Sequence, residues 1–236
     1  MKIGILPAIL AILICSSTVS SWAQDQPFEA DIYTVGLWHF NEISGIVAGD
    51  SSGNGLHGEL QNGVAWDPDG KFGGCVSFDH SGTEGQRVFV PDDPLLDISD
   101  VLTIDAWIYL RPTSDLGFIV SRWDKSSSEP KGQFILDIAA TNTLRFLCAN
   151  VTETFTIAVE DIPFEQWILV SAVFDNGQMA IFINEEQRAF GFAPFTTLTS
   201  GEFTHDELNI GDHWRDLNYP YTFEGKIDEV RLSNIS

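Results

Sequence analysis

The stretch that decides the fold is Phe223-Glu224-Gly225-Lys226-Ile227-Asp228-Glu229-Val230-Arg231-Leu232. Apolar residues recur in it at Ile227, Val230 and Leu232, which is typical of a half-buried β-strand. The two-residue alternation slips by one position at Asp228 and Glu229, and such a slip predicts a β-bulge. A strand so near the end of the sequence stabilises a fold only where it pairs inside a sheet. We therefore expect a closing strand that joins the N- and C-terminal halves of an all-β sandwich.

The most regular alternation in the chain runs from Leu102 to Leu110. Its even-numbered positions are apolar, and its odd-numbered positions include Trp107 and Tyr109, so that both faces carry large side chains. This pattern is typical of a strand at the centre of a sheet. Further strands are predicted at 35–40, around Leu60, 64–66, around Val76, 87–90, 118–122, 134–138, 144–148, 155–159, 167–174, 179–183, 188–192 and 208–210. No helical period of useful length occurs, which predicts an all-β chain.

Two hairpins are suggested by turn residues. Asn176-Gly177, between 167–174 and 179–183, is a strong signal for a two-residue hairpin loop. The next connection, Ile183-Asn184-Glu185-Glu186, lacks the glycine that such loops favour. We expect that hairpin to be longer or bent.

The chain of 236 residues suits one large all-β domain rather than two domains of average size. Residues 1–23 have the charged start, apolar middle and small-residue end of a secretory signal peptide, with cleavage expected after Ala23. The remaining chain divides into a short linker, 24–34, and one domain, 35–236. No second long apolar run follows, so we expect a soluble protein in the extracellular or periplasmic space without membrane insertion.

The composition is strongly acidic, with 34 Asp and Glu against 12 Lys and Arg and a formal net charge of −22. Such a chain repels phosphate backbones, which argues against nucleic acid as a partner. It is compatible with divalent cations, although most of the acids are explained by solubility alone. Beyond the signal peptide only Cys75 and Cys148 remain, and the sequence leaves open whether they form a disulfide.

Several phrases carry a family resemblance when taken in this order and spacing. They are Gly36-Leu37-Trp38-His39-Phe40-Asn41-Glu42, Asp50-Ser51-Ser52-Gly53-Asn54-Gly55, Lys71-Phe72-Gly73-Gly74, Leu102-Thr103-Ile104-Asp105-Ala106-Trp107-Ile108 and Ile227-Asp228-Glu229-Val230-Arg231. From about Val35 to Ser233 the chain resembles the laminin-G-like, concanavalin A-like jelly-roll family. The resemblance implies a two-sheet antiparallel jelly-roll sandwich.

The resemblance also implies a calcium site, in which the loop after residue 49 and an acid of the closing strand hold the ion. Carried over to this sequence, its ligands are Asp50, Gly53, Asn54, His57 through its carbonyl, and Asp228, with Glu42 as an additional candidate. The loop itself places oxygen-bearing side chains at alternate positions, but Gln61 stands where an EF-hand requires glutamate. A different interpretation remains open, in which Asp50 caps the backbone amides of its own loop.

Catalysis is not expected. Jelly-roll glucanases use acids on one face of a strand, and the nearest run here, Glu160-Asp161-Ile162-Pro163-Phe164-Glu165, is interrupted by proline. The motifs of serine hydrolases and zinc proteases, and a phosphate-binding loop, are absent from the sequence. A divergent glycoside hydrolase stays a remote alternative.

Binding is the function that remains, and aromatic residues crowd the segment before the closing strand. Planar rings flanked by polar groups suit the C–H faces and hydroxyls of a sugar. The predicted ligand-binding residues are Trp214, Arg215, Asp216, Tyr219 and Tyr221, with Asp212 beside them. A second candidate is Trp123 with Asp124 and Lys125, whereas Trp38, Trp107 and Trp167 are predicted to be structural.

We therefore expect a secreted, calcium-stabilised, lectin-like module that recognises a glycan or glycoprotein. The alternative is a calcium-dependent adhesion or structural protein of the surface that binds protein partners.

Overall fold

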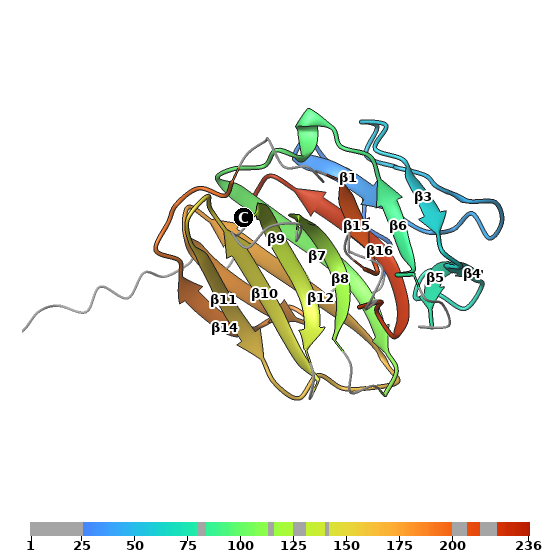
Figure 1. Cartoon of the computed structure of the whole chain (residues 1–236). Coiled ribbons are helices and arrows are strands. Elements are labelled where there is room, and N and C mark those ends of the chain that lie inside the picture. The colour runs from blue at the N-terminus through green and yellow to red at the C-terminus, as the bar shows by residue number, and fades with distance from the viewer. Residues whose placement is uncertain are drawn as a thin grey trace, which may run out of the picture.

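Two antiparallel sheets of eight strands each form the protein, as the computed structural model shows for residues 26–79, 84–112, 116–124, 131–139, 142–199, 207–212 and 221–236. The sheets lie face to face (Figure 1). One short 3₁₀ turn, Pro94–Leu96, is the sole helical element of the described residues. No helix in the described part of the chain is long and apolar enough to cross a membrane. The predicted two-sheet jelly-roll sandwich is confirmed.

The first sheet, called sheet A here, contains the closing strand. Its spatial order is β14 (Glu186–Phe192), β13 (Gln178–Ile183), β12 (Trp167–Asp175), β7 (Val101–Leu110), β16 (Gly225–Ser233), β5 (Cys75–Phe78) and β4 (Ala65–Asp67), with β1 (Thr34–Trp38) also paired to β16. Sheet B follows the order β11 (Thr154–Val159), β10 (Thr143–Ala149), β9 (Lys131–Ala139), β8 (Gly117–Asp124), β15 (Leu208–Ile210), β6 (Arg87–Val90), β3 (Gly58–Gln61) and β2 (Val47–Ala48). The edge strands β11 and β14 lie at the same side of the sandwich (Figure 1).

The closing strand β16 joins the two halves of the chain, as predicted. It pairs with β1 and β5 from the N-terminal half and with β7 from the middle. Its register against β7 shifts between Asp228 and Arg231, which confirms the bulge. Glu229 takes a positive φ of 51° at the bulge, a conformation that few side chains adopt.

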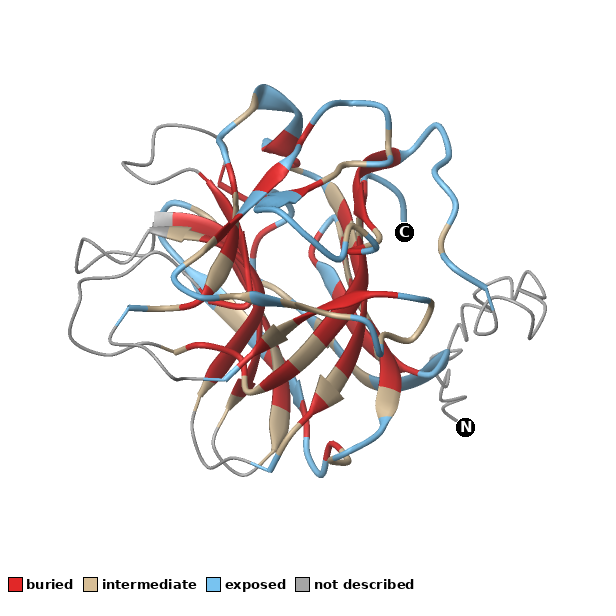
Figure 2. Ribbon diagram, turned by 90° about the vertical axis from the view of Figure 1, so that its right-hand side faces the viewer, coloured by how far each residue is buried: buried red, intermediate tan, exposed pale blue. Residues whose placement is uncertain are grey.

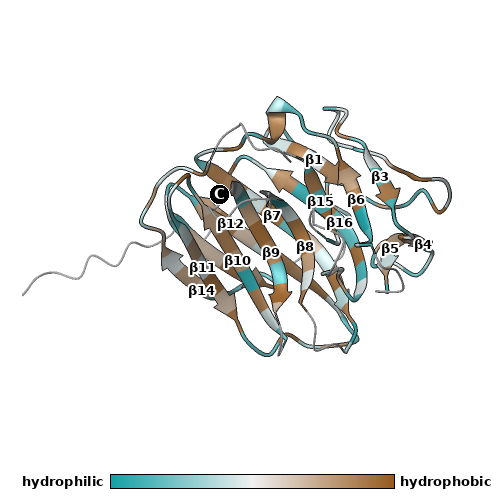
Figure 3. Ribbon diagram, viewed as in Figure 1, coloured by the Kyte–Doolittle hydropathy of each residue, from teal (hydrophilic) through white to brown (hydrophobic). Residues whose placement is uncertain are grey.

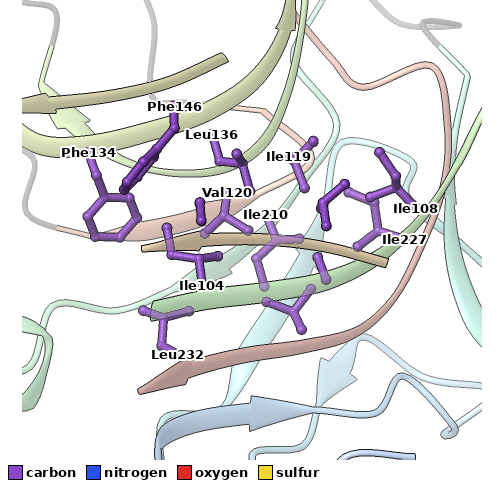
Figure 4. Close-up of a cluster of buried hydrophobic side chains, with 14 of the residues drawn as sticks. Ile104, Ile108, Ile119, Val120, Phe134, Leu136, Phe146, Ile210, Ile227 and Leu232 are labelled. Carbon is purple, nitrogen blue, oxygen red and sulfur yellow. The ribbon is translucent and has the colours of Figure 1, made fainter. Parts of the chain in front are cut away.

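The core lies between the sheets and follows from the alternation along their strands. Inward side chains of β7, β8, β9, β10, β15 and β16 meet there (Figure 4), and the labelled residues are at most 1% exposed. Buried positions follow the strands and exposed ones gather in the loops (Figure 2), and the hydropathy follows the same division (Figure 3). Burial of each large apolar side chain contributes roughly 1.5–3 kcal/mol.

The Asn176-Gly177 hairpin forms as predicted, with Asp175 opposite Gln178 and positive φ at both loop residues. The expectation of a longer loop after Ile183 is wrong, because Ile183 pairs directly with Glu186. Asn184 and Glu185 adopt positive φ, of 49° and 68°, without a glycine. The irregularity falls instead in the strands, where the register of β13 against β14 shifts after Ile181.

The two cysteines are free and buried, and they lie in different sheets. Burial raises the pKa of the Cys75 thiol to about 12 and also raises that of Cys148. Both thiols therefore stay protonated near neutral pH and act as small apolar side chains.

Candidate functional site

The predicted calcium loop is organised by the carboxylate of Asp50. Its Oδ1 accepts hydrogen bonds from the backbone N–H of Leu37 at 3.0 Å and of Ser52 at 2.8 Å. Its Oδ2 accepts from the Ser52 hydroxyl at 2.7 Å and the N–H of Leu56 at 2.9 Å. Burial alone would raise the pKa of Asp50, but these hydrogen bonds outweigh burial and lower it. The interpretation that Asp50 caps its own loop therefore describes this arrangement.

The other predicted loop ligands also make local contacts. His57 Nδ1 accepts a hydrogen bond from the N–H of Asp50 at 3.0 Å. The Asn54 amide donates to the carbonyls of Thr34 and Val35 in β1, at 3.2 and 2.9 Å. Gly53 has a φ of 91°, which only glycine adopts without strain. These contacts fasten the loop to the first strand.

Asp228 has a different environment, because it is fully buried within the β16 bulge. Its Oδ2 accepts the N–H groups of Lys71 at 2.8 Å and Phe72 at 3.0 Å. Its Oδ1 is buried and has no hydrogen-bond partner in the described structure. Burial, helped by the neighbouring charge of Glu229, raises the pKa of Asp228 to about 7.

Glu229, the next residue, is buried as well and holds the N-terminal part of the chain. One carboxylate oxygen contacts His39 Nδ1 at 2.8 Å, and the other accepts the N–H of Phe28 at 2.8 Å. The hydrogen bond to Glu229 raises the pKa of His39. The bulge thus directs two adjacent carboxylates to segments distant in sequence, residues 71–72 on one side and residues 28 and 39 on the other.

Asp50 and Asp228 belong to separate hydrogen-bond networks. Trp38 in β1 bridges to Asp50 on one side and pairs with Val230 of β16 on the other, so β1 lies between the loop and the closing strand. The backbones of Asp50 and of β16 are therefore two strand spacings apart, or about 10 Å. No three His, Cys, Asp or Glu side chains gather into a metal-binding group in the part of the chain that is described.

Asp50 and Asp228 differ in how well their carboxylates could bind calcium, because they differ in the hydrogen bonds that they already accept. All four bonds accepted by Asp50 come from N–H or O–H donors, so an ion there would have to replace some of them. Asp228 fits better, because an unpartnered buried carboxylate oxygen is the group that a cation would neutralise. Glu42 resembles it, since its Oε1 accepts the N–H of Gly49 at 2.7 Å while its buried Oε2 has no partner among the described residues.

Most of the predicted ligand-binding residues, namely Trp214, Arg215, Asp216 and Tyr219, lie outside the described residues. The two ends of their segment are described and are bonded to each other. The hydroxyl of buried Thr222 donates to Asp212 Oδ2 at 2.8 Å, and the N–H of Phe223 donates to the carbonyl of Gly211 at 2.7 Å. The segment of nine residues between Asp212 and Thr222 is thus held together at its two ends.

Gln86 links the Asp212–Thr222 hydrogen bond to the connection between β5 and β6, and these polar contacts are called the base of the segment. Its N–H donates to the Thr222 hydroxyl at 3.1 Å, and its side chain exchanges two hydrogen bonds of 2.8 Å with Asp79. Gly85 packs so closely on Asp212 that an added Cβ would lie 2.1 Å from its Oδ2. Sequence reasoning missed Gln86 and Thr222, since a polar residue beside a strand carries no signal that it will be buried.

Tyr221 is the one predicted ring of this site that the structure describes. It is half-buried, its ring centroid lies 5.9 Å from that of Phe118, and its carbonyl accepts the Phe118 N–H at 3.0 Å. The site and the Asp50 loop lie apart along β16, because Val230, which pairs with Trp38, stands five residues beyond Gly225. That separation is about 16 Å along the strand.

The tryptophans singled out in the sequence within the described residues differ in how far they are buried. Trp38 is fully buried, and its indole N–H donates to the Leu56 carbonyl at 2.8 Å, as expected of a structural residue. Trp107 is also buried, under Phe72 and Lys71, with the Lys71 ammonium 4.1 Å from its ring centroid. Trp167 is in a strand but only half-buried, on the outer face of sheet A. Trp123 is half-buried and packs on Gly132 in β9, Asp124 ends β8, and Lys125 lies outside the described residues.

The acids between β11 and β12 form no catalytic pair. Glu160, Asp161 and Glu165 are exposed in a turn, where Asp161 and Glu165 have positive φ values of 59° and 56°. They belong to an irregular connection rather than to one face of a strand, which is what the glucanase arrangement requires.

The two antiparallel sheets define this molecule as a jelly-roll domain. A family profile described as the concanavalin A-like lectin/glucanases superfamily, of the laminin G type, matches residues 81–236. The chain belongs to this family. The profile begins after β5, and the structure adds the earlier strands to the same two sheets. No curated protein matches the sequence.

Solved structures with the same fold include binding domains and parts of enzymes. Domain 4 of AbnA, a GH43 extracellular arabinanase from Geobacillus stearothermophilus, in complex with arabinotriose, has a TM-score of 0.60 at 20% identity, with 86% of this chain and 92% of that chain covered. The botulinum neurotoxin serotype D binding domain has a TM-score of 0.62 at 12% identity, with coverages of 86% and 49%. Trypanosoma rangeli sialidase in complex with sialic acid has a TM-score of 0.61 at 12% identity, with coverages of 87% and 31%. This chain thus spans about half the length of the neurotoxin domain and less of the sialidase.

Proposed function

We infer that this protein is a non-catalytic, lectin-like binding module that recognises a glycan or glycoprotein through the segment between Asp212 and Thr222. The observation that carries the proposal is the buried Asp212–Thr222 hydrogen bond, which closes the base of this ring-rich segment. Gln86 and Asp79 brace the base from the neighbouring connection. A binding segment needs such an anchor, because ordering a free loop costs conformational entropy on binding.

Two further facts support a glycan as the ligand. Structures of the same fold include one complexed with arabinotriose and a botulinum neurotoxin DC binding domain complexed with SialylT. The segment itself combines Trp214, Tyr219 and Tyr221 with Arg215 and Asp216, the residue types that contact sugar faces and hydroxyls. Catalysis is left out of the proposal because the acids nearest to the glucanase pattern, Glu160, Asp161 and Glu165, lie in an exposed turn and not on one strand face.

The second candidate is an adhesion or structural protein that binds protein partners. It is favoured by the same fold in a botulinum neurotoxin DC binding domain complexed with rat synaptotagmin II, which is a protein ligand. A glycan array and a pull-down from the native envelope separate the two candidates, since only a lectin binds isolated glycans.

Calcium belongs to the proposal as a stabilising ion rather than a catalytic one. The sequence-based ligand set is Asp50, Gly53, Asn54, His57 and Asp228, and the unpartnered oxygen of Asp228 supports that residue as the centre of the site. When bound, the ion would supply positive charge to a buried carboxylate. Without it, the backbone amides of Lys71 and Phe72 stabilise only one of the two oxygens.

Export is the proposed localisation, either outside the cell or in the periplasm. It rests on the signal-peptide pattern of residues 1–23, which lie outside the described structure. The exported protein should begin at Gln24, and intact mass would reveal a retained leader.

The proposed site is tested with the mature chain and the variants Trp214→Ala and Tyr221→Ala on a glycan array, followed by titration calorimetry with the best glycan. We expect each variant to weaken binding about tenfold, because a sugar-stacking ring contributes on the order of 1 kcal/mol or more. Val151→Ala is the matched control, since Val151 is 70% exposed on the distant turn between β10 and β11. Unchanged affinity in both ring variants would place the glycan elsewhere.

A further inference from the structure

The outer face of sheet A carries aromatic and aliphatic side chains over β12, β13 and β14 that the proposed glycan site does not use. In β12, Trp167, Leu169, Ser171 and Val173 alternate with the inward core residues. Strand pairing places Tyr109 beside Trp167, Phe182 beside Ser171, and Phe190 beside Ala180. Paired residues share a face, so these side chains extend across β7, β12, β13 and β14.

The orientation of β14 is established by Gly191. An added Cβ at this glycine would lie 2.8 Å from Ile157 and 3.0 Å from Phe155, both in β11 of the other sheet. Gly191 therefore points inward, and its neighbours Phe190 and Phe192 point outward. Phe190 is 43% exposed and Phe192 67% exposed, and their rings form an edge-to-face pair with centroids 4.9 Å apart.

A second pair of rings stands at the other end of the same face. Tyr109 and Trp167 are both half-buried, with centroids 5.7 Å apart. Trp167 and Val173, which is in the same row as Phe190, are six residues apart in β12, or about 20 Å. The two ring pairs are thus too far apart for one sugar unit and suit an extended ligand.

The middle of this face carries no charged side chain, although the rest of the molecule is rich in acids. The outward positions between the ring pairs are Trp167, Leu169, Ser171 and Val173 in β12, and Ala180 and Phe182 in β13, none of which is charged. Two acids lie on the same face beside these positions. Asp105, opposite Ser171, is neutralised by Arg231, whose Nη2 lies 2.8 Å from Asp105 Oδ2. Asp175 ends β12 in the same row as Phe192. In a chain with a net charge of −22, such a surface is suited to an uncharged partner.

We propose that the outer face of β12, β13 and β14, with Tyr109 and Trp167 at one end and Phe190 and Phe192 at the other, binds the flat face of an uncharged polysaccharide. Aromatic rings pack on the C–H faces of sugar units, and a neutral polymer brings no charge against the acidic molecule. A second copy fits less well. It carries the same formal net charge of −22, so two copies repel each other.

The surface is tested by sedimentation of the mature protein with microcrystalline cellulose and with chitin, both uncharged and insoluble. We expect the wild-type protein to bind at least one of them. The double variant Phe190→Ala/Phe192→Ala should bind the same polymer with about tenfold lower affinity. Phe192→Trp should retain binding, since it keeps a ring in place. Val151→Ala, an exposed apolar residue outside this face, should leave binding unchanged.

The same assay separates this proposal from the glycan site between Asp212 and Thr222. Tyr221→Ala should leave sedimentation with the polymer unchanged, and the double variant should keep its affinity for soluble glycans. Absence of wild-type binding to both polymers, or equal binding by the double variant, would overturn the proposal. A wild-type dimer that becomes a monomer in the double variant, measured by light scattering, would assign the face to self-association instead.

Discussion

Asp50 and Asp228 are the same residue type in the same sandwich, yet their environments are opposite. The Asp50 carboxylate receives four hydrogen bonds in a partly exposed loop, and its pKa is lowered. Asp228 is fully buried and receives two from the backbone of residues 71–72, and burial raises its pKa to about 7. The difference shows that the number of donors, weighed against burial, decides whether a carboxylate stabilises the fold by itself or needs a proton or a cation.

The largest effect is expected when the cap is removed by Asp50→Ala. The N–H groups of Leu37, Ser52 and Leu56 would lose their acceptor, and we expect a loss of about 3 kcal/mol in the free energy of unfolding. For a domain of this size the loss corresponds to roughly 6–12 °C in the melting temperature. Thermal unfolding followed by circular dichroism measures it, with Glu160→Ala, at an exposed acid of the turn between β11 and β12, as the control. A melting temperature within one or two degrees of wild type would show that the cap is dispensable.

The next largest effect is expected from calcium binding at Asp228. An ion that binds the folded chain alone stabilises it by about 2.7 kcal/mol at a hundredfold excess over its Kd. We expect millimolar calcium to raise the melting temperature of the wild-type protein, and Asp228→Asn to abolish that rise. Loss of the rise in Asp50→Asn as well would mean that one ion is held by both acids, as the sequence-based set requires. Equal melting temperatures in calcium and in chelator for the wild-type protein would contradict the site.

A smaller effect is expected from pH in the presence of chelator. The folded-state pKa of Asp228, about 7, lies above its unfolded value near 3.9, so the folded chain binds more protons between these values. The free energy of unfolding should therefore fall as pH rises from about 4 to about 7. His39 acts in the same direction, because its raised pKa makes its contribution present below about pH 6.5 and lost above the folded-state value.

Asp228→Asn should flatten this pH dependence and stabilise the chelated protein at pH 8 by about 1–2 kcal/mol, since it removes a buried charge but keeps an acceptor for residues 71–72. Urea unfolding at pH 5, 6.5 and 8 provides the measurement. His39→Gln serves as the comparison variant, with an expected effect below about 1 kcal/mol. If the wild-type and Asp228→Asn curves ran parallel across this range, Asp228 would have an ordinary pKa.

Sequence reasoning was most successful where local pattern and fold agree. The alternation from Leu102 to Leu110 identified a central strand, and β7 does lie between β12 and β16. The slip at Asp228 and Glu229 identified the bulge. Of the longer or bent hairpin expected after Ile183, the longer loop was wrong, and strand pairing holds Glu185 in a conformation that its side chain does not favour. Local turn preference amounts to about 1 kcal/mol and is overridden by the pairing of two strands.

By itself the sequence determined the two-residue periods, the turn residues and the acidic balance, because these depend on each residue and its near neighbours. Only the tertiary structure decided how each acid is used. Whether a carboxylate meets four donors or two depends on which distant backbone amides reach it, Leu37 for Asp50 and Lys71 with Phe72 for Asp228. The outer apolar face of sheet A arises in the same way, since Trp167 and Phe190 share a surface only after β12, β13 and β14 pair. Strand pairing brings such groups together across long stretches of chain, and no local pattern records the result.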